Sequence, residues 1–135
     1  MTYPTHFQQL VQAAAAQPEP QRLLFVFAAA SLPDDATATQ RDRFLAGGGG
    51  ALEPLACVDK GVDDFTTFEA LVAESRDASP PWQVVFIAGL AGLDGRAPSS
   101  QLIDGALEAM VERIRTGSLG GLMALDVAGE PLSFS

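Results

Sequence analysis

The chain has 135 residues, of which 47% are hydrophobic and 19% are charged. This composition excludes a disordered segment and favours one folded domain over residues 1–135. The 8 Lys and Arg against 17 Asp and Glu give a formal net charge of −9. Such a charge repels phosphate backbones and anionic lipid surfaces, so we expect neither nucleic acid nor a membrane as a partner. The acidity keeps an apolar domain in solution, or it forms an acidic face for a basic partner.

Cysteine and histidine are each present once, as Cys57 and His6. One cysteine makes no internal disulfide and no thiolate zinc cage, so a reducing, cytoplasmic compartment is expected. A metal site or a Ser-His-Asp triad would depend on His6 alone, and we therefore expect no metal and no cofactor. No basic N-terminal region precedes an apolar stretch, and no stretch approaches the ~18 apolar residues that span a bilayer.

The first predicted elements are a helix over residues 5–16 and a strand near residues 23–28. The helix is indicated by apolar residues at helical spacing, and Pro18 and Pro20 end it. The strand is indicated by the continuous apolar run Leu-Leu-Phe-Val-Phe, which is typical of a strand covered on both faces. Both elements therefore belong to a buried core.

The signal weakens between Ser31 and Pro54. Residues 37–45 favour a short helix, and the four glycines at 47–50 end any regular structure. A short strand is predicted at 55–58. The connection before it is long enough to be functional or mobile.

The second half of the chain alternates helices and strands. Thr66 and Glu69 form a capping box that begins a helix over 66–76, and an apolar run predicts a strand at 83–88. The clearest pattern is an apolar stripe of period 3.6 over 99–116, a helix that Gly117 caps.

A last strand is predicted at 122–127. The turn at 128–131 then folds residues 132–134 back as an antiparallel edge hairpin. The whole order predicts a single-domain α/β layered sandwich, with about four mostly parallel strands and three to four helices joined by right-handed crossovers.

A parallel sheet binds ligands at the carboxyl ends of its strands, so the residues that follow each strand are the candidates for a site. They are Ser31, Asp34, Asp35, Asp59, Lys60, residues 89–96 and Asp126. Asp59 and Lys60 supply a base or a carboxylate ligand, or they form an exposed ion-pair turn. Cys57 is inert packing in an apolar strand, or a nucleophile or redox sensor.

The loop from Gly89 to Ser100 is the strongest local candidate, because it joins a buried strand to the start of the clearest helix. Backbone N–H groups at a helix start favour an anion, and the predicted anion-binding residues are Gly92, Gly95, Arg96, Ser99 and Ser100. The spacing matches neither common phosphate-loop fingerprint. The alternative is an ordinary strand-to-helix loop whose glycines adopt positive φ and in which Ser99 caps the helix.

Three segments carry a resemblance to a group of short bacterial proteins: EPQRLLFVF at 19–27, CVDK at 57–60 and GRAPSS at 95–100. Some members of that group bear the name ribonucleotide reductase alpha subunit. The reductase family of that name has chains several times longer and uses several cysteines for radical chemistry. With one cysteine here, the resemblance implies shared positions over nearly the whole chain and no reductase activity or functional residue.

No catalytic constellation stands out from the sequence. The mean hydropathy of +0.17 leaves apolar surface to cover, and a symmetric dimer is the commonest way to cover it. We therefore expect a non-enzymatic module that acts through a protein partner or as a homodimer. The alternative is a small enzyme or sensor that binds an anionic metabolite or nucleotide at the Gly89–Ser100 loop.

Overall fold

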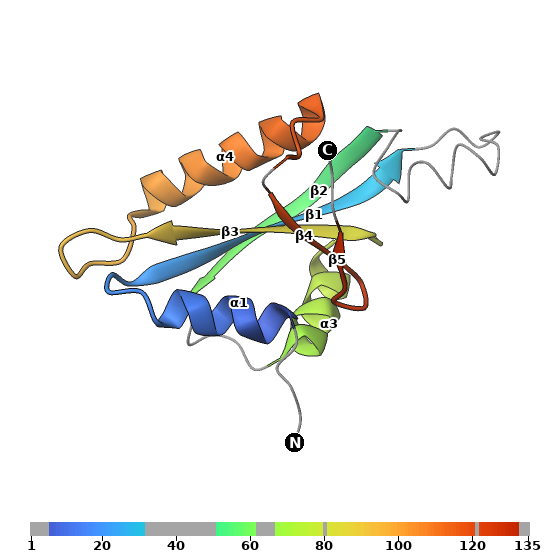
Figure 1. Ribbon diagram of the computed structural model, residues 1–135. Helices are drawn as coiled ribbons and strands as arrows, with labels where there is room; N and C mark the ends of the chain where they lie inside the picture. The colour runs from blue at the N-terminus through green and yellow to red at the C-terminus, as the bar shows by residue number, and fades with distance from the viewer. Residues whose placement is uncertain (1–5, 32–50, 62–66, 80, 121, 133–135) are drawn as a thin grey trace, which may run out of the picture.

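The structure, a computed structural model, describes residues 6–31, 51–61, 67–79, 81–120 and 122–132. The elements follow one another along the chain as shown in Figure 1: α1 (His6–Ala15), β1 (Gln21–Ser31), β2 (Ala51–Gly61), α3 (Phe68–Ala78), β3 (Val84–Ala91), α4 (Ser100–Thr116), β4 (Met123–Asp126) and β5 (Pro131–Leu132). The predicted helix at 37–45, the glycines at 47–50, and Asp34 and Asp35 lie outside the described residues.

The strands form one five-stranded sheet in the order β2-β1-β3-β4-β5, and each described pair of neighbours is antiparallel. The prediction of a mostly parallel sheet is therefore wrong. Its premise was that continuous apolar runs mark parallel strands, which helices cover on both faces. Here an antiparallel sheet has helices on both faces, so its central strands show the same continuous apolar runs.

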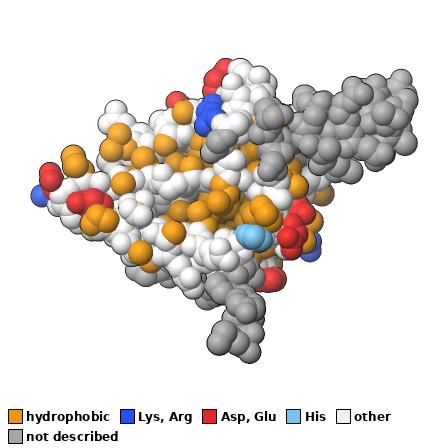
Figure 2. All heavy atoms as spheres, in the orientation of Figure 1, with side chains coloured by type: hydrophobic (Ala, Val, Ile, Leu, Met, Phe, Trp, Pro, Cys, Tyr) orange, Lys and Arg blue, Asp and Glu red, His pale blue; other side chains and the backbone are white. Residues whose placement is uncertain are grey.

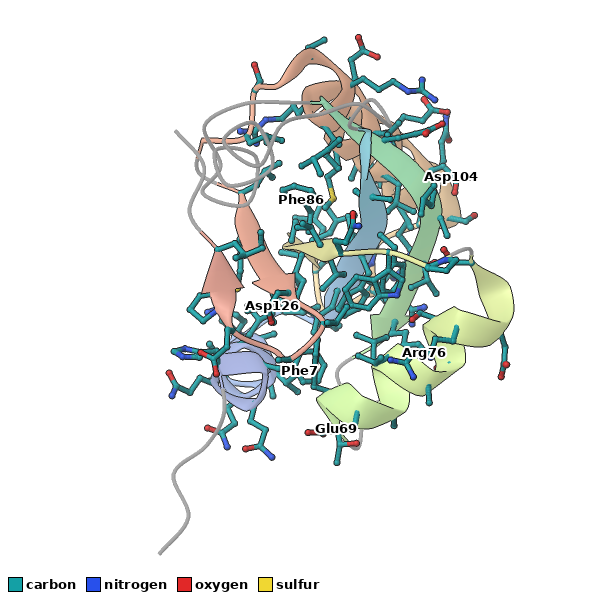
Figure 3. All side chains as sticks on the ribbon, turned by 90° about the vertical axis from the view of Figure 1, so that its right-hand side faces the viewer. Phe7, Glu69, Arg76, Phe86, Asp104 and Asp126 are labelled. Atoms are coloured by element: carbon teal, nitrogen blue, oxygen red, sulfur yellow. The ribbon has the colours of Figure 1, made fainter. Side chains whose placement is uncertain are left out.

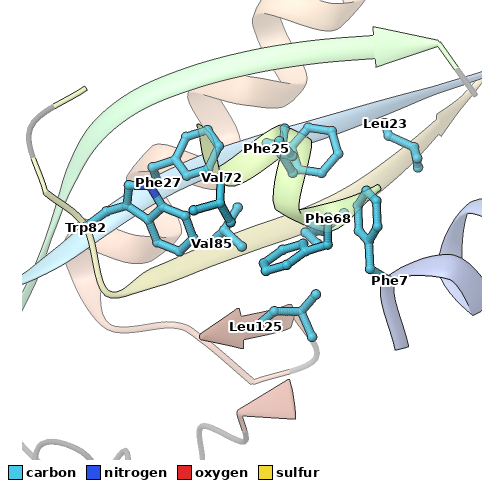
Figure 4. Packing of buried hydrophobic residues seen from close by; sticks show 11 residues of the cluster. Phe7, Leu23, Phe25, Phe27, Phe68, Val72, Trp82, Val85 and Leu125 are labelled. Carbon is cyan, nitrogen blue, oxygen red and sulfur yellow. The ribbon is translucent and has the colours of Figure 1, made fainter. Parts of the chain in front are cut away.

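Residues of β1 alternate between the two faces of the sheet. Leu23, Phe25 and Phe27 face α1 and α3, where they pack with Phe7, Phe68 and Trp82. The rings of Phe7 and Phe68 lie 5.3 Å apart and those of Phe27 and Trp82 lie 5.0 Å apart (Figure 4). This face of the sheet is therefore an aromatic-rich core.

The opposite face of the sheet is covered by α4. Leu24 and Val26 of β1 pack there with Phe86 of β3 and with Ile103, Met110 and Ile114 of α4. Figure 3 shows α4 on one side of the sheet and α1 and α3 on the other. Because α4 contacts β1 and β2 more than β3, it lies over the β2 side of the sheet.

The helix ends follow local capping chemistry. Ser99 and Gly117 cap α4 as predicted: the Ser99 hydroxyl accepts a hydrogen bond from the N–H of Leu102, and Gly117 is left-handed with φ 79°. The N-cap of α3 is Thr67, one residue after the predicted Thr66, and its side chain accepts from the N–H of Ala70. The helix therefore begins two residues later than predicted.

The predicted C-terminal hairpin is present as β4 and β5. The Asp126 carboxylate accepts hydrogen bonds from the N–H groups of Ala128 and Glu130 at 2.8 and 3.0 Å, and Gly129 has φ 83°. Residues 133 and 134, which the prediction also included, lie outside the described part. None of the described helices is long and apolar enough to cross a membrane.

Buried hydrogen bonds anchor α3 to the sheet at the single tryptophan. The indole N–H of Trp82 donates to Ser75 Oγ at 2.7 Å, and the Ser75 hydroxyl donates to the Val72 carbonyl at 2.7 Å. Replacing Ser75 by Ala leaves the buried indole N–H without its acceptor, so S75A should lower the free energy of unfolding by about 1–3 kcal/mol. Denaturant titration followed by Trp82 fluorescence measures this loss. The exposed Ser118→Ala change is the control, and equal midpoints for both variants would contradict the prediction.

Candidate interaction surface

The loop between β3 and α4 turns on itself before the helix begins. Leu93 and Arg96 exchange both backbone hydrogen bonds at 3.0 Å, and Asp94 and Gly95 between them have φ 54° and 75°. These angles are those of a type I′ turn, the tight hairpin turn that Asp-Gly favours. Gly92 is required by close approach, since a Cβ there would lie 1.7 Å from the carbonyl oxygen of Arg96.

The candidate anion donors in this loop have partners within the chain. The N–H of Gly95 donates to the Glu19 carboxylate at 2.7 Å, and that of Gly92 donates to the Pro20 carbonyl at 2.8 Å. Arg96, Ser99 and Ser100 are exposed. A carboxylate thus already lies at the turn where the anion was predicted. Gly92, Arg96 and Ser99 nevertheless line one hollow of ≈ 480 Å³ before α4, and the anion site stays a prediction.

The other candidates, Asp59 and Lys60, point to opposite faces of the sheet, as successive residues of a strand must. Asp59 lies on the α4 face and accepts two hydrogen bonds from the Arg22 guanidinium at 2.6 and 3.0 Å. Lys60 lies on the α3 face and pairs with Glu74 at 2.8 Å. Each residue therefore forms its own ion pair, and they share no site.

The antiparallel sheet also separates the strand ends that a parallel sheet would gather. The ends of β2 and β3 lie at one end of the sheet, where Gln21 pairs with Ala91 and Arg22 with Gly61. β1 and β4 finish at the opposite end. Ser31 and Asp126 are consequently remote from the loop at residues 92–99, and neither lines the hollow that this loop forms.

The outer side of β2 is the feature that sequence reasoning missed. Of the described strands, only β1 pairs with β2, so the other side of this 11-residue strand faces no described strand. Such an edge presents unpaired N–H and C=O groups that can hydrogen-bond to another chain. At the far edge, β5 is only two residues long and begins with Pro131.

The first half of β2 is a poor template for a further strand. The register with β1 shifts between Phe27 and Ala28, which leaves Leu55 as the extra residue of a bulge, and Pro54 precedes it. Bulges and prolines both discourage pairing at an edge. The regular part of the edge is Ala56–Lys60.

Hollows flank this regular part on both faces of the sheet, and Cys57 lines both. On the α3 face a small hollow of ≈ 140 Å³ lies between β2 and α3. On the α4 face a groove of ≈ 420 Å³ is lined by Cys57, Asp104, Leu107, Glu108, Val111, Glu112 and Arg115. Figure 3 shows β2 at the outer edge of the sheet with Asp104 beside it. We call the regular edge and this groove the β2–α4 surface.

Cys57 lies where the edge and the groove meet. Its residue is exposed, in contrast to the buried packing position expected from its apolar strand, because β2 is an edge strand. Partial burial beside α4 nevertheless raises the pKa of its thiol. A raised pKa keeps the sulfur protonated at neutral pH, which argues against a nucleophilic role.

Elsewhere, single apolar side chains are exposed. Leu93 and Leu102 are 75% and 60% exposed at the loop before α4, and Figure 2 shows hydrophobic side chains over the middle of the visible face with Asp and Glu toward its margins. Scattered apolar exposure is normal for a soluble domain.

Within the described residues, no group of three or more His, Cys, Asp or Glu is placed to hold a metal ion.

No protein-family model, curated protein or solved structure matches this chain.

Gly92 tests the tight turn in this loop. Because an added Cβ would collide with backbone, G92A should lower the free energy of unfolding by about 1–3 kcal/mol. Gly105 is the matched control: a Cβ there meets nothing within 4 Å, and Ala in a helix interior should raise stability by about 1 kcal/mol. Denaturant titration of both variants checks the opposite signs, and a stabilising G92A would contradict the turn geometry.

The Cys57 thiol should react slowly with a disulfide reagent such as dithionitrobenzoate. Its raised pKa means that deprotonation requires a higher pH than for an ordinary thiol, so the thiolate fraction at neutral pH is small. In dilute solution, the pH profile of the rate should lie to higher pH than that of the same chain unfolded in guanidinium. Coincident profiles would contradict the effect of burial.

Proposed function

We propose that this protein is a non-enzymatic module that acts by self-association, with two copies joined edge to edge at β2. The single observation that carries the proposal is the regular edge Ala56–Lys60, whose outer side faces no described strand and borders a groove lined in part by Leu107 and Val111. Backbone pairing along such an edge supplies hydrogen bonds, and the neighbouring groove adds side-chain contact. The proposed compartment is the cytoplasm, since the one cysteine makes no internal disulfide.

A two-fold axis beside Cys57 gives the simplest arrangement. It would make β2 of the second copy run antiparallel to β2 of the first and extend the sheet across the interface. The same residues of both copies would then meet at the axis, as in any closed two-fold dimer. Pairing would then use Ala56, Cys57 and Val58 of each copy, which lie beyond the bulge. The two cysteines would face each other directly.

Spacing supports a helix contact in the same arrangement. The axis would lie midway between the two β2 strands, and neighbouring strands lie about 4.8 Å apart. A helix resting midway over β1 and β2 is therefore about 5 Å from the axis. The two copies of α4 would then lie about 10 Å apart, within the usual packing range of helices. The α4 groove would thus be filled by the α4 helix of the second copy.

Light scattering coupled to gel filtration tests the association at tens of micromolar protein. The expected mass is about 28 kDa, twice the 14.1 kDa of one chain. Cys57→Glu places two carboxylates opposite each other across the axis and should give the monomer mass, since like charges directly opposite are destabilising. Cys57→Ser is the matched control and should remain dimeric. A wild-type chain that is monomeric throughout this range refutes the proposal.

Mild oxidation provides a second measurement of the same pairing. Residues directly opposite in an antiparallel pair have Cα atoms about 4.5–5.5 Å apart, within the range of about 4.4–6.8 Å that a disulfide needs. Copper-catalysed oxidation of the dimer should therefore link the two chains through Cys57. The C57S variant should form no linked species.

A further inference from the structure

We infer that the charges along α4 select the partner of the β2–α4 surface: a second copy of this chain, with its α4 antiparallel to the first. This inference rests on the proposed self-association at β2 and adds which side chains determine the alignment. Asp104 lies at one end of the groove and Arg115 at the other. A groove with opposite charges at its two ends is complementary to its own antiparallel copy.

The positions along the helix support this alignment. Asp104, Glu108 and Glu112 follow one another at intervals of four residues, as do Leu107, Val111 and Arg115, and the two rows lie side by side on one face of α4. Cys57 is the β2 residue that lines the same groove. A two-fold axis at Cys57 would therefore cross this groove, and the inferred alignment places it at the middle of the stretch from Asp104 to Arg115.

An axis at that middle places Asp104 of one copy opposite Arg115 of the other, and the reverse. Two symmetric ion pairs would then close the ends of the interface, with Leu107 and Val111 between them. Charge pairs of this kind determine register and exclude wrong partners. Neither Asp104 nor Arg115 forms an ion pair in the described part of the single chain, where the two salt bridges are Arg22–Asp59 and Lys60–Glu74.

Glu108 and Glu112 weaken this alignment. The same axis places them opposite Val111 and Leu107 of the other copy, and both are exposed, so their carboxylates can reach water at the rim. They repel one another across the interface and add no attraction. The double variant Glu108→Gln, Glu112→Gln should therefore dimerise more tightly than the wild type, whereas a basic protein partner in this groove would require both carboxylates.

Charge reversal in separate chains tests the alignment. Asp104→Arg puts arginine opposite arginine at both ends of a dimer, and Arg115→Asp puts aspartate opposite aspartate. Each variant alone should dimerise at least about ten-fold more weakly than the wild type, because like charges are forced together. Sedimentation equilibrium measures the dissociation constants, and circular dichroism verifies that each variant folds.

Mixing the two variants supplies the decisive measurement. In the mixed dimer, Arg at position 104 faces Asp at position 115 and Arg115 faces Asp104, so both contacts become attractive. A 1:1 mixture should regain the dimer mass that neither variant reaches alone, which misfolding of either variant cannot produce. Arg113→Asp reverses a charge in the same turn of α4 on a residue that does not line the groove; on its own it should dimerise as tightly as the wild type.

Two results overturn the inference while leaving the proposed self-association intact: single variants that dimerise as tightly as the wild type, or a mixture that stays monomeric while the wild type dimerises. A monomeric wild type, by contrast, refutes the proposed function itself. If the wild type is monomeric and binds a basic peptide in a manner that the E108Q, E112Q double variant abolishes, the groove belongs to a different protein partner, and the inference fails with it.

Discussion

The burial of β1 on both faces is the constraint on which the rest of the structure depends. Every side chain from Leu23 to Ala28 is at most 3% exposed. A strand in that state requires a strand on each side and a helix layer on each face. β2 and β3 provide the flanking strands, while α4 covers one face and α1 and α3 cover the other.

Once β1 is central, β2 becomes an outer strand, and its properties follow. One of its sides pairs with β1, and α4 packs against it. The strand therefore keeps polar backbone on its outer side, next to a groove that Leu107 and Val111 help to line. The bulge at Leu55 and the proline before it protect half of this edge and leave the half that begins at Ala56.

Periodicity and capping were sufficient to locate the elements, but they did not determine the relative direction of the strands. The strands near residues 23–28, 83–88 and 122–127, the helix at 99–116 and the caps Ser99 and Gly117 could all be read from local patterns, because their causes are local. Parallel and antiparallel central strands bury the same side chains when helices cover both faces, so the sequence pattern does not distinguish them. Pairing is a long-range property that no local residue pattern encodes here.

The candidate surface was harder to predict than the fold for a related reason. Asp94-Gly95 is a hairpin-turn signal that was available in the sequence, and it would have favoured a closed loop over an anion cradle. The apolar character of 55–58, however, gives no sign that the strand lies at an edge, and so Cys57 was expected to be packed inside. Whether an apolar strand is exposed depends on whether a second strand pairs with its other side, and this is not visible in its own residues.

The edge, the groove and the charges of α4 acquire a common explanation only when they are considered together. An acidic chain of net charge −9 gains nothing from bringing two copies together at random. Association then requires a surface where backbone pairing is available and where a basic residue such as Arg115 can meet the acid of the other copy. On the described part of the chain, the β2–α4 surface combines these features, and in the proposed dimer the net negative charge would disfavour other alignments of the two copies.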